Sequence, residues 1–147
     1  MILPSSVLFC CTMNAIRSAM AEGIMKRFHG QQVFVDSAGV RLGELDPLMV
    51  QVMSEIDVDM SRHKPKVFDA LTDDSFDVAI ALSPEARGAA DDLTRYRHCD
   101  VRLWNVVDPS LSEGSGDQRL AAYRQTRDEI QHKILELFPR VRDHFKL

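Results

Sequence analysis

The sequence predicts an α/β domain in which helices cover both faces of a parallel sheet. Predicted strands alternate with predicted helices along the chain, the strands are continuously apolar, and a closing helix carries one apolar face. Strands that are apolar on both sides are typical of a parallel sheet covered on both faces. The chain has 147 residues, 45% of them hydrophobic, which is enough for one core. We therefore expect residues 1–147 to form a single domain.

The first half of the chain predicts two strands, each followed by a helix. Ser6 to Cys11 is an apolar run with the length of a buried strand, and Ser18 to Phe28 carries apolar residues at helical spacing. Val33 to Val35 predicts a second strand, which the sequence DSAG ends as a turn. Pro47 to Ile56 predicts a helix, with Asp46 as its cap and the proline in its first turn.

The second half repeats the pattern. Phe76 to Ser83 predicts a buried strand, and the SPEA sequence that begins at Ser83 is typical of a helix start. Asp100 to Val106 predicts a fourth strand, and Ser110 to Gly116 predicts a loop. From Asp117 to Phe138 apolar residues recur three or four positions apart, which predicts a closing helix that the next residue, a proline, ends.

Composition and charge narrow the function classes. The net charge of -4, with charged residues spread along the chain, disfavours a nucleic-acid partner. No leader and no stretch near the length of a membrane span is found, so we expect a soluble, cytoplasmic protein that does not bind membranes. Three cysteines are an odd count for a disulfide framework, and one of them could be a working thiol. No metal-ligand spacing is present, so we expect no metal and no cofactor.

The stretch from Cys11 to Ser18 links the first strand to the first helix. A loop at this place can point several backbone N–H groups at one spot, where the helix dipole adds partial positive charge. These groups, with Arg17 and the Ser18 hydroxyl, would stabilise a Cys11 thiolate. The planar guanidinium of Arg17 can bind two oxygens of a tetrahedral anion. The pattern predicts an oxyanion site with a nucleophilic sulfur beneath it.

Asp108 follows the fourth predicted strand, and ligands of parallel sheets bind beyond the carboxyl ends of the strands. Cys11 and Asp108 could therefore face one pocket. The alternative for Asp108 is that the Asp-Pro sequence only starts a turn.

The sequence Cys11-Thr-Met-Asn-Ala-Ile-Arg17-Ser18, followed by Met-Ala-Glu, resembles the phosphate loop of the low-molecular-weight protein tyrosine phosphatases and of the arsenate reductases that share their fold. DSAG, the FDVAIALS strand, Asp108-Pro109 and RDEI in the closing helix extend the resemblance over the whole chain. It implies a three-layer α/β/α fold of the phosphotyrosine protein phosphatase I type, with a four-stranded parallel sheet.

The resemblance also implies roles for single residues. Cys11 would be the nucleophile, Arg17 the clamp on the oxyanion, and Asp108 the acid that protonates the leaving oxygen and then activates water. Ser18 would support the thiolate and Asn14 would brace the loop. The other residues of the anion-binding loop would be Thr12, Met13, Ala15 and Ile16.

The chain departs from the phosphatase pattern at several places. Met13 and Ala19 stand where the family often has glycine and proline, and a positive φ at Met13 would cost on the order of 1 kcal/mol. Ile16 replaces a second cysteine that many of the phosphatases carry. No aromatic residue occurs in VRLGELDP or PSLSEGSGD, which correspond to the segments that flank the phosphotyrosine pocket, so an aryl ring would have little to stack on.

Three functions stay open on these residues. The first is a cysteine-dependent phosphatase acting on a phosphorylated protein or a small phosphate monoester through a cysteinyl phosphate. The second is an arsenate reductase. Its thioredoxin-coupled form needs two further cysteines near the end of the third strand, where this chain has LSPEARGAADDL with Ser83 at the first position, so an external thiol would be required. The third is a non-catalytic module that binds phosphate or arsenate.

The other candidate residues receive structural interpretations. Cys10 and Cys11 are adjacent on a strand and should face opposite sides, which predicts a buried Cys10. Cys99 precedes the fourth strand, far from the pocket, and Trp104 should lie in the core. Arg41 borders the pocket and either selects an anionic substrate or is solvated. Solvated or helix-surface positions are expected for His29, His63, His98, His132 and His144.

Overall fold

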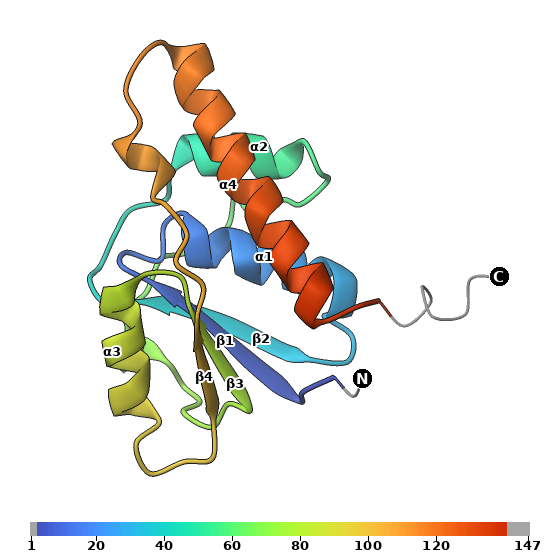
Figure 1. The fold of residues 1–147 in the computed structure, drawn as a ribbon, viewed down its shortest axis with the longest axis vertical. Helices are drawn as coiled ribbons and strands as arrows, with labels where there is room; N and C mark the ends of the chain where they lie inside the picture. The colour runs from blue at the N-terminus through green and yellow to red at the C-terminus, as the bar shows by residue number, and fades with distance from the viewer. Residues whose placement is uncertain (1–2, 141–147) are drawn as a thin grey trace, which may run out of the picture.

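A computed structural model describes residues 3–140, which form three layers around a four-stranded parallel sheet (Figure 1). The spatial order of the strands is β2-β1-β3-β4, and every neighbouring pair is parallel. This architecture confirms the predicted fold class. The strands are β1 (Ser6–Cys11), β2 (Phe34–Gly39), β3 (Val78–Ala81) and β4 (Asp100–Leu103).

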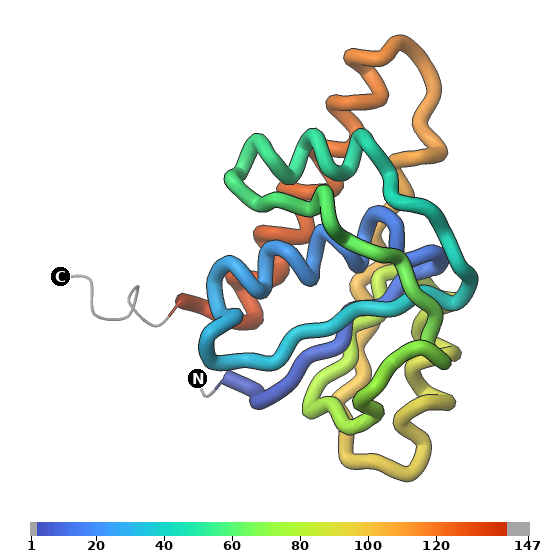
Figure 2. The backbone as a smooth tube through the Cα atoms, turned by 180° about the vertical axis from the view of Figure 1, so that it is seen from behind, coloured from blue at the N-terminus to red at the C-terminus, as the bar shows by residue number. Residues whose placement is uncertain are grey.

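Helices cover both faces of the sheet in the described part of the chain (Figure 1). Three helices pack on one face and α3 packs on the other. The long connection from α2 to β3 runs back beside the end of β2, where the Gly39 N–H donates to the Lys66 carbonyl at 2.8 Å (Figure 2). The helices are α1 (Arg17–His29), α2 (Pro47–Ser54), α3 (Pro84–Leu93) and α4 (Gly116–Leu137), with short 3-10 turns η1 (Phe68–Ala70) and η2 (Pro109–Leu111).

The core is divided by β1, whose side chains alternate between the two faces. Val7, Phe9 and Cys11 join the cluster under α1, α2 and α4, whereas Leu8 and Cys10 join the cluster under α3. Successive side chains of a strand point to opposite faces, which places the two adjacent cysteines in different surroundings. Cys10 is fully buried, as predicted, and burial raises the pKa of its thiol.

The predicted strand boundaries are partly wrong. The DSAG sequence does not end β2 as a turn, because Ser37 to Gly39 pair with Phe9 to Cys11 of the central strand. The strands β3 and β4 are shorter than predicted and end at Ala81 and Leu103. Pairing with neighbouring strands, a non-local property, decides where each strand ends.

Helix starts and the position of the tryptophan agree with the sequence analysis. Asp46 caps α2 by accepting from the N–H groups of residues 48 and 49, and Ser83 caps α3. The closing helix α4 ends at Leu137, before the proline. Trp104 lies just after β4, partly buried against the core, with its ring 6.3 Å from that of Phe9.

A charged cluster joins α4 to the residue that follows α2. The Arg124 Nη2 lies 2.7 Å from a Glu55 carboxylate oxygen, and the Arg127 Nη1 lies 2.8 Å from the other. Hydrogen bonds from Arg124 and then Arg127 lower the pKa of Glu55 from 4.5 to about 2. The folded protein therefore binds this proton only at lower pH than the unfolded chain does. The stabilisation is fully present above about pH 4.5 and is lost as the pH falls toward 2.

The variant Glu55→Gln should have a Tm a few degrees below that of the wild type at pH 7. The difference should close between pH 4.5 and pH 2, because the wild-type carboxylate is protonated there. Thermal unfolding followed by circular dichroism across this range measures it. Glu136→Gln, on an exposed position of α4, is the matched control. A Tm difference that stays constant with pH would contradict the role of Glu55.

Candidate functional site

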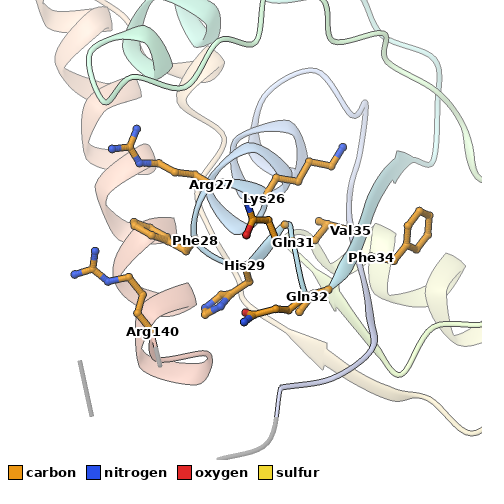
Figure 3. Close-up of a pocket in the computed structure, with 11 residues that line it drawn as sticks. Lys26, Arg27, Phe28, His29, Gln31, Gln32, Phe34, Val35 and Arg140 are labelled. Atoms are coloured by element: carbon orange, nitrogen blue, oxygen red, sulfur yellow. The ribbon is translucent and has the colours of Figure 1, made fainter. Parts of the chain in front are cut away.

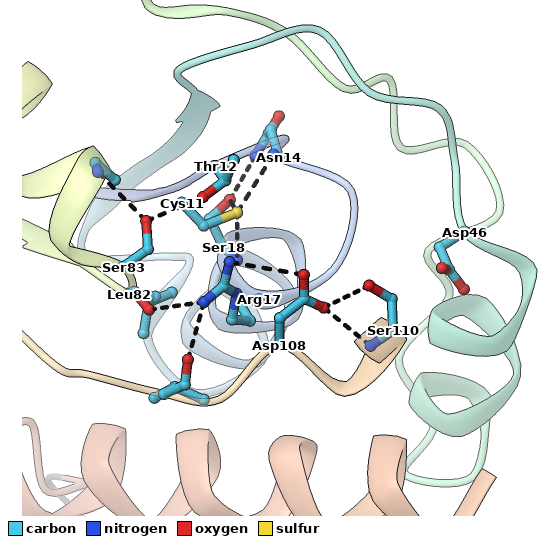
Figure 4. A network of polar contacts seen from close by, with 12 residues as sticks. Cys11, Thr12, Asn14, Arg17, Ser18, Asp46, Leu82, Ser83, Asp108 and Ser110 are labelled. Carbon is cyan, nitrogen blue, oxygen red and sulfur yellow. Dashed lines mark hydrogen bonds and ion pairs between the residues drawn. The ribbon is translucent and has the colours of Figure 1, made fainter. Parts of the chain in front are cut away.

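Cys11 lies at the carboxyl end of β1 and is 2% exposed. Three donors surround its sulfur: the Asn14 N–H at 3.3 Å, the Ser18 N–H at 3.5 Å and the Ser18 hydroxyl at 2.9 Å (Figure 4). The Cys11 sulfur therefore lies where three polar hydrogens of the loop converge. The structure thus brings Cys11 and Ser18 together as the sequence analysis expected.

Asn14 fixes the direction of the hydrogen bonds in the loop. Its Oδ1 accepts from the Lys66 backbone N–H at 3.1 Å, which identifies the other side-chain atom as the donor nitrogen. That nitrogen donates to the hydroxyls of Ser18, at 2.8 Å, and Ser37, at 2.9 Å. Because Ser18 accepts from Asn14, its own hydrogen is available for Cys11. The Asn14 side chain thus joins Ser18 of the loop to Ser37 and to the backbone of Lys66 through hydrogen bonds.

Several residues of this network were missed by the sequence analysis, among them Ser37, Glu22 and His63. Ser37 lies in the DSAG segment and donates to the carboxylate of Glu22, which also accepts from Lys26 at 2.5 Å. The Nε2 of His63 donates to the Asn14 carbonyl at 2.8 Å, so the solvated position predicted for this histidine is wrong. No local signal in the sequence marks these residues, because their partners lie on segments far away along the chain.

Met13 does not have the left-handed backbone that would have made it costly. That conformation belongs to Asn14, at φ 55°, and asparagine tolerates it better than other non-glycine residues. Met13 is instead 45% exposed at the mouth of the site. A Cβ on Gly39 would lie 2.7 Å from both the Asn14 nitrogen and the Met13 carbonyl carbon, so glycine lets β2 approach the loop.

Arg17 begins α1 and is 9% exposed. Its Nη1 donates to the carbonyls of Leu82, at 3.3 Å, and Val106, at 2.9 Å, which follow β3 and β4. These two bonds hold the guanidinium plane in place. The Nη2 lies 4.0 Å from the Asp108 Oδ2 (Figure 4). Arg17 therefore links the anion-binding loop to the ends of two neighbouring strands.

Asp108 uses its two carboxylate oxygens differently. The Oδ1 accepts from the Ser110 N–H at 2.9 Å and from the Ser110 hydroxyl at 2.7 Å, which caps the η2 turn. The Oδ2 is the atom beside Arg17. Asp108 therefore starts a turn and also lines the pocket beside Arg17, so starting the turn is not all that its side chain does.

A pocket of about 350 Å³ opens above Cys11. Its wall contains no aromatic side chain, in agreement with the sequence analysis, and Ala15 and Ile16 form its apolar part. Met13, which lines the pocket, has an exposed side chain. Three further exposed aliphatic residues are chain neighbours of lining residues, namely Leu42, Val107 and Leu111. The lining residues are Cys11, Thr12, Met13, Ala15, Ile16, Arg17, Arg41, Glu44, Asp46, Asp108 and Ser110.

The pocket wall holds one thiol, that of Cys11. Ser83 is 4% exposed, caps α3 and accepts a hydrogen bond from the Thr12 hydroxyl at 3.3 Å (Figure 4). Cys99 directly precedes β4 and so lies at the amino-terminal ends of the parallel strands, whereas Cys11 lies at their carboxyl ends. Burial raises the pKa of the Cys99 thiol. Neither Cys10 nor Cys99 can reach Cys11 without rearrangement of the sheet.

A larger hollow of about 790 Å³ lies at the other edge of the sheet, between the end of α1 and the start of β2 (Figure 3). Lys26 pairs with Glu22, and Arg27 donates to the Ile56 carbonyl at 2.7 Å, so these cations are already bonded. His29 is buried and its Nε2 donates to the Phe138 carbonyl at 2.8 Å, which corrects its predicted solvated position.

Two further histidines, His98 and His132, are exposed as expected, and His144 lies outside the described residues. Residues 3–140 contain no cluster of side chains suited to hold a metal ion. No helix in the same range is long and apolar enough to span a membrane.

Residues 6–146 match the family described as low molecular weight phosphotyrosine protein phosphatase. The chain belongs to this family. Relatives within it include an arsenate reductase of Bacillus subtilis, 29% identical over 130 residues, which cover 88% of this chain and 92% of the relative. An arsenate reductase of Halalkalibacterium halodurans is 33% identical over 129 residues, which cover 87% and 91% of the two chains.

Solved structures of the family share the fold. An arsenate reductase in an oxidised state superimposes with a TM-score of 0.76 at 23% identity, over 90% of this chain and 95% of the other. The tyrosine phosphatase AmsI of Erwinia amylovora has a TM-score of 0.71 at 20% identity, over 94% and 95%. Both kinds of enzyme thus share this fold, and the curated relatives named above are arsenate reductases.

Proposed function

We propose that the protein reduces arsenate with the help of an external thiol. The observation that carries this proposal is the pocket above Cys11, which has polar and aliphatic walls, no aromatic side chain and no second thiol. Such a wall suits a small tetrahedral oxyanion better than a phosphorylated aromatic ring. The names of the curated relatives support the same choice. The phosphatase, our first interpretation of the sequence, becomes the second candidate.

In the proposed reaction the Cys11 thiolate attacks the arsenic atom of arsenate. A sulfur–arsenic bond forms and an arsenic–oxygen bond breaks, as one hydroxyl group of arsenate takes a proton and leaves as water, with the charge of the oxyanion stabilised by Arg17. The thiolate of an external donor then attacks the Cys11 sulfur, and the electron pair of the broken sulfur–arsenic bond stays on arsenic, which leaves as arsenite. A mixed disulfide remains on Cys11.

A second donor thiolate attacks the mixed disulfide and returns Cys11 to the thiolate. In sum, arsenate and two thiols give arsenite, one disulfide and one water, so that arsenic gains the two electrons that the thiols lose. The external donor supplies the further thiols that the pocket lacks, because the residue beside Thr12 is Ser83 and not a cysteine.

Phosphate ester hydrolysis is the second candidate, and Asp108 favours it. One oxygen of its carboxylate is held by Ser110, which leaves the other directed toward the pocket, where the protonated carboxyl would donate to the leaving oxygen of an ester. Cys11 would form a cysteinyl phosphate that water then hydrolyses. A solved arsenate reductase of the same fold, in its phosphate-binding state, supports oxyanion binding for either reaction.

The variant Asp108→Asn separates the two reactions. An ester leaving group needs the proton, so hydrolysis of an aryl phosphate should fall about 100-fold or more. Arsenate carries its own exchangeable protons, so its thiol-dependent reduction should fall less than about tenfold. Both activities are measured on the same preparation, as arsenite formed with a low-molecular-weight thiol and as phenolate released from the ester.

The wild type decides between the candidate functions in the same assay. Arsenite formation that depends on the thiol supports the proposal. Aryl phosphate hydrolysis without arsenite formation would replace the proposal by the phosphatase. Phosphate or arsenate binding by calorimetry, with neither turnover, would indicate a non-catalytic oxyanion-binding module.

A further inference from the structure

Arg41 is the second cation in the wall of the pocket. The first, Arg17, is almost fully buried and already donates to two backbone carbonyls. The Arg41 side chain is 56% exposed and stands at the mouth of the pocket. Arg17 can therefore bind the oxyanion next to Cys11, while Arg41 can bind a second molecule that enters the mouth of the pocket.

The backbone of Arg41 is fixed to the anion-binding loop. Its N–H donates to the Thr12 carbonyl at 2.9 Å, and the Val40 N–H donates to the Cys11 carbonyl at 3.2 Å. The base of the Arg41 side chain thus stays next to the nucleophile, and only the side chain can move. A long cationic side chain on a fixed base can bind a charged group beside Cys11 without rearrangement of the loop.

Arg41 is at present paired across the mouth with Glu85 of α3. Its Nη1 lies 2.7 Å from the Glu85 Oε2, and the Glu85 side chain is also about half exposed. Exposed ion pairs contribute little free energy, because water screens both charges. A carboxylate on an incoming molecule can therefore replace Glu85 as the partner of Arg41.

Apart from the two arginines, the charges of the pocket wall would repel an anion. They are the carboxylates of Glu44, Asp46 and Asp108. Asp46 is bonded to the Tyr123 hydroxyl and to the start of α2, and Asp108 is bonded to Ser110. Arg41 is thus the group at the mouth that can attract a negatively charged reactant.

We propose that Arg41 binds a carboxylate of the thiol donor, so that the donor is a small acidic thiol. This inference rests on the proposed function, which requires two external thiols for each arsenate. The pocket is larger than a tetrahedral oxyanion and leaves room for such a molecule above it. Glu85 holds Arg41 at the mouth until the donor carboxylate replaces it.

Alkylation of Cys11 tests the binding of carboxylates without any arsenate. Iodoacetate and iodoacetamide differ by one carboxylate, and fragment mass spectrometry separates the Cys11 product from Cys10. The rate with iodoacetate divided by the rate with iodoacetamide should fall about threefold to tenfold in Arg41→Gln. The same ratio should rise in Glu85→Gln. Arg95→Gln removes an exposed arginine that lies just after α3 and pairs with Asp92 of that helix, and it should leave the ratio unchanged.

Arsenate reduction with matched thiols tests the donor itself. At equal thiolate concentration, 3-mercaptopropionate should support faster reduction than 2-mercaptoethanol in the wild type, and Arg41→Gln should remove the preference. An alkylation ratio equal in Arg41→Gln and the wild type would overturn the inference, whatever the activity. A lower alkylation ratio in Arg41→Gln, together with no arsenate reduction by any thiol in the wild type, would contradict both the proposed function and the binding of a thiol donor. Arg41 would then be a carboxylate-binding residue of unrelated function.

Discussion

Replacement of Cys11 by serine is expected to lower both arsenate reduction and phosphate ester hydrolysis at least about 1000-fold. A serine hydroxyl is a far weaker acid than a thiol, so the donors of Asn14 and Ser18, which surround the sulfur at 2.9 to 3.5 Å, have no anion to stabilise. Oxyanion binding should survive, because Arg17 and the backbone of the loop are unchanged. Steady-state rates and phosphate calorimetry measure the two effects.

Cys10→Ser is the matched control, since the two cysteines are neighbours on β1 and face opposite sides of the sheet. The Cys10 sulfur lies in the cluster under α3, 3.7 Å from the Ile80 carbonyl and 3.8 Å from the Ala86 carbonyl, so the substitution leaves the pocket side of β1 unchanged. Its turnover should stay within about threefold of the wild type. Loss of activity in Cys10→Ser with retention in Cys11→Ser would remove Cys11 as the nucleophile.

Replacement of Arg17 by lysine is expected to lower kcat/KM about 100-fold to 1000-fold, although the charge is kept. The guanidinium of Arg17 holds the carbonyls of Leu82 and Val106 with one nitrogen and leaves the others for an oxyanion. A single ammonium group cannot do both. Kinetics with arsenate and with an aryl phosphate measure the loss.

The same variant leaves the two carbonyls without their shared donor, so its Tm should also fall by several degrees. Phosphate affinity measured well below the Tm separates the loss of oxyanion binding from the loss of stability. An Arg17→Lys protein with kcat/KM within about fivefold of the wild type would show that a planar donor is not needed at this position.

The fold and the centre of the site could be predicted because their signals are local. The apolar run of β1 and the spacing of apolar residues after Arg17 predict a strand followed by a helix. A loop between two such elements has its N–H groups directed by the helix that follows. The short segment from Cys11 to Ser18 was therefore sufficient to predict that these residues and Arg17 form one anion-binding loop.

The support of that loop comes from residues far away along the chain. Ser37 reaches Asn14 because β2 pairs with β1 in a register that places Gly39 beside Cys11, and a shift by one residue would turn Ser37 to the other face. His63, in the connection from α2 to β3, donates to the carbonyl of the same asparagine. No local pattern gives the register of two strands.

The sequence by itself therefore determined the order of strands and helices, the nucleophile loop and the absence of aromatic residues near it. Only the tertiary structure decided that Asn14, and not Met13, takes the left-handed backbone, that His29 and His63 are bonded inside the molecule, and that Arg41 stands opposite Glu85. The physical reason is that backbone propensity and apolar periodicity act over a few residues, whereas hydrogen bonds and ion pairs depend on which distant segments are packed together.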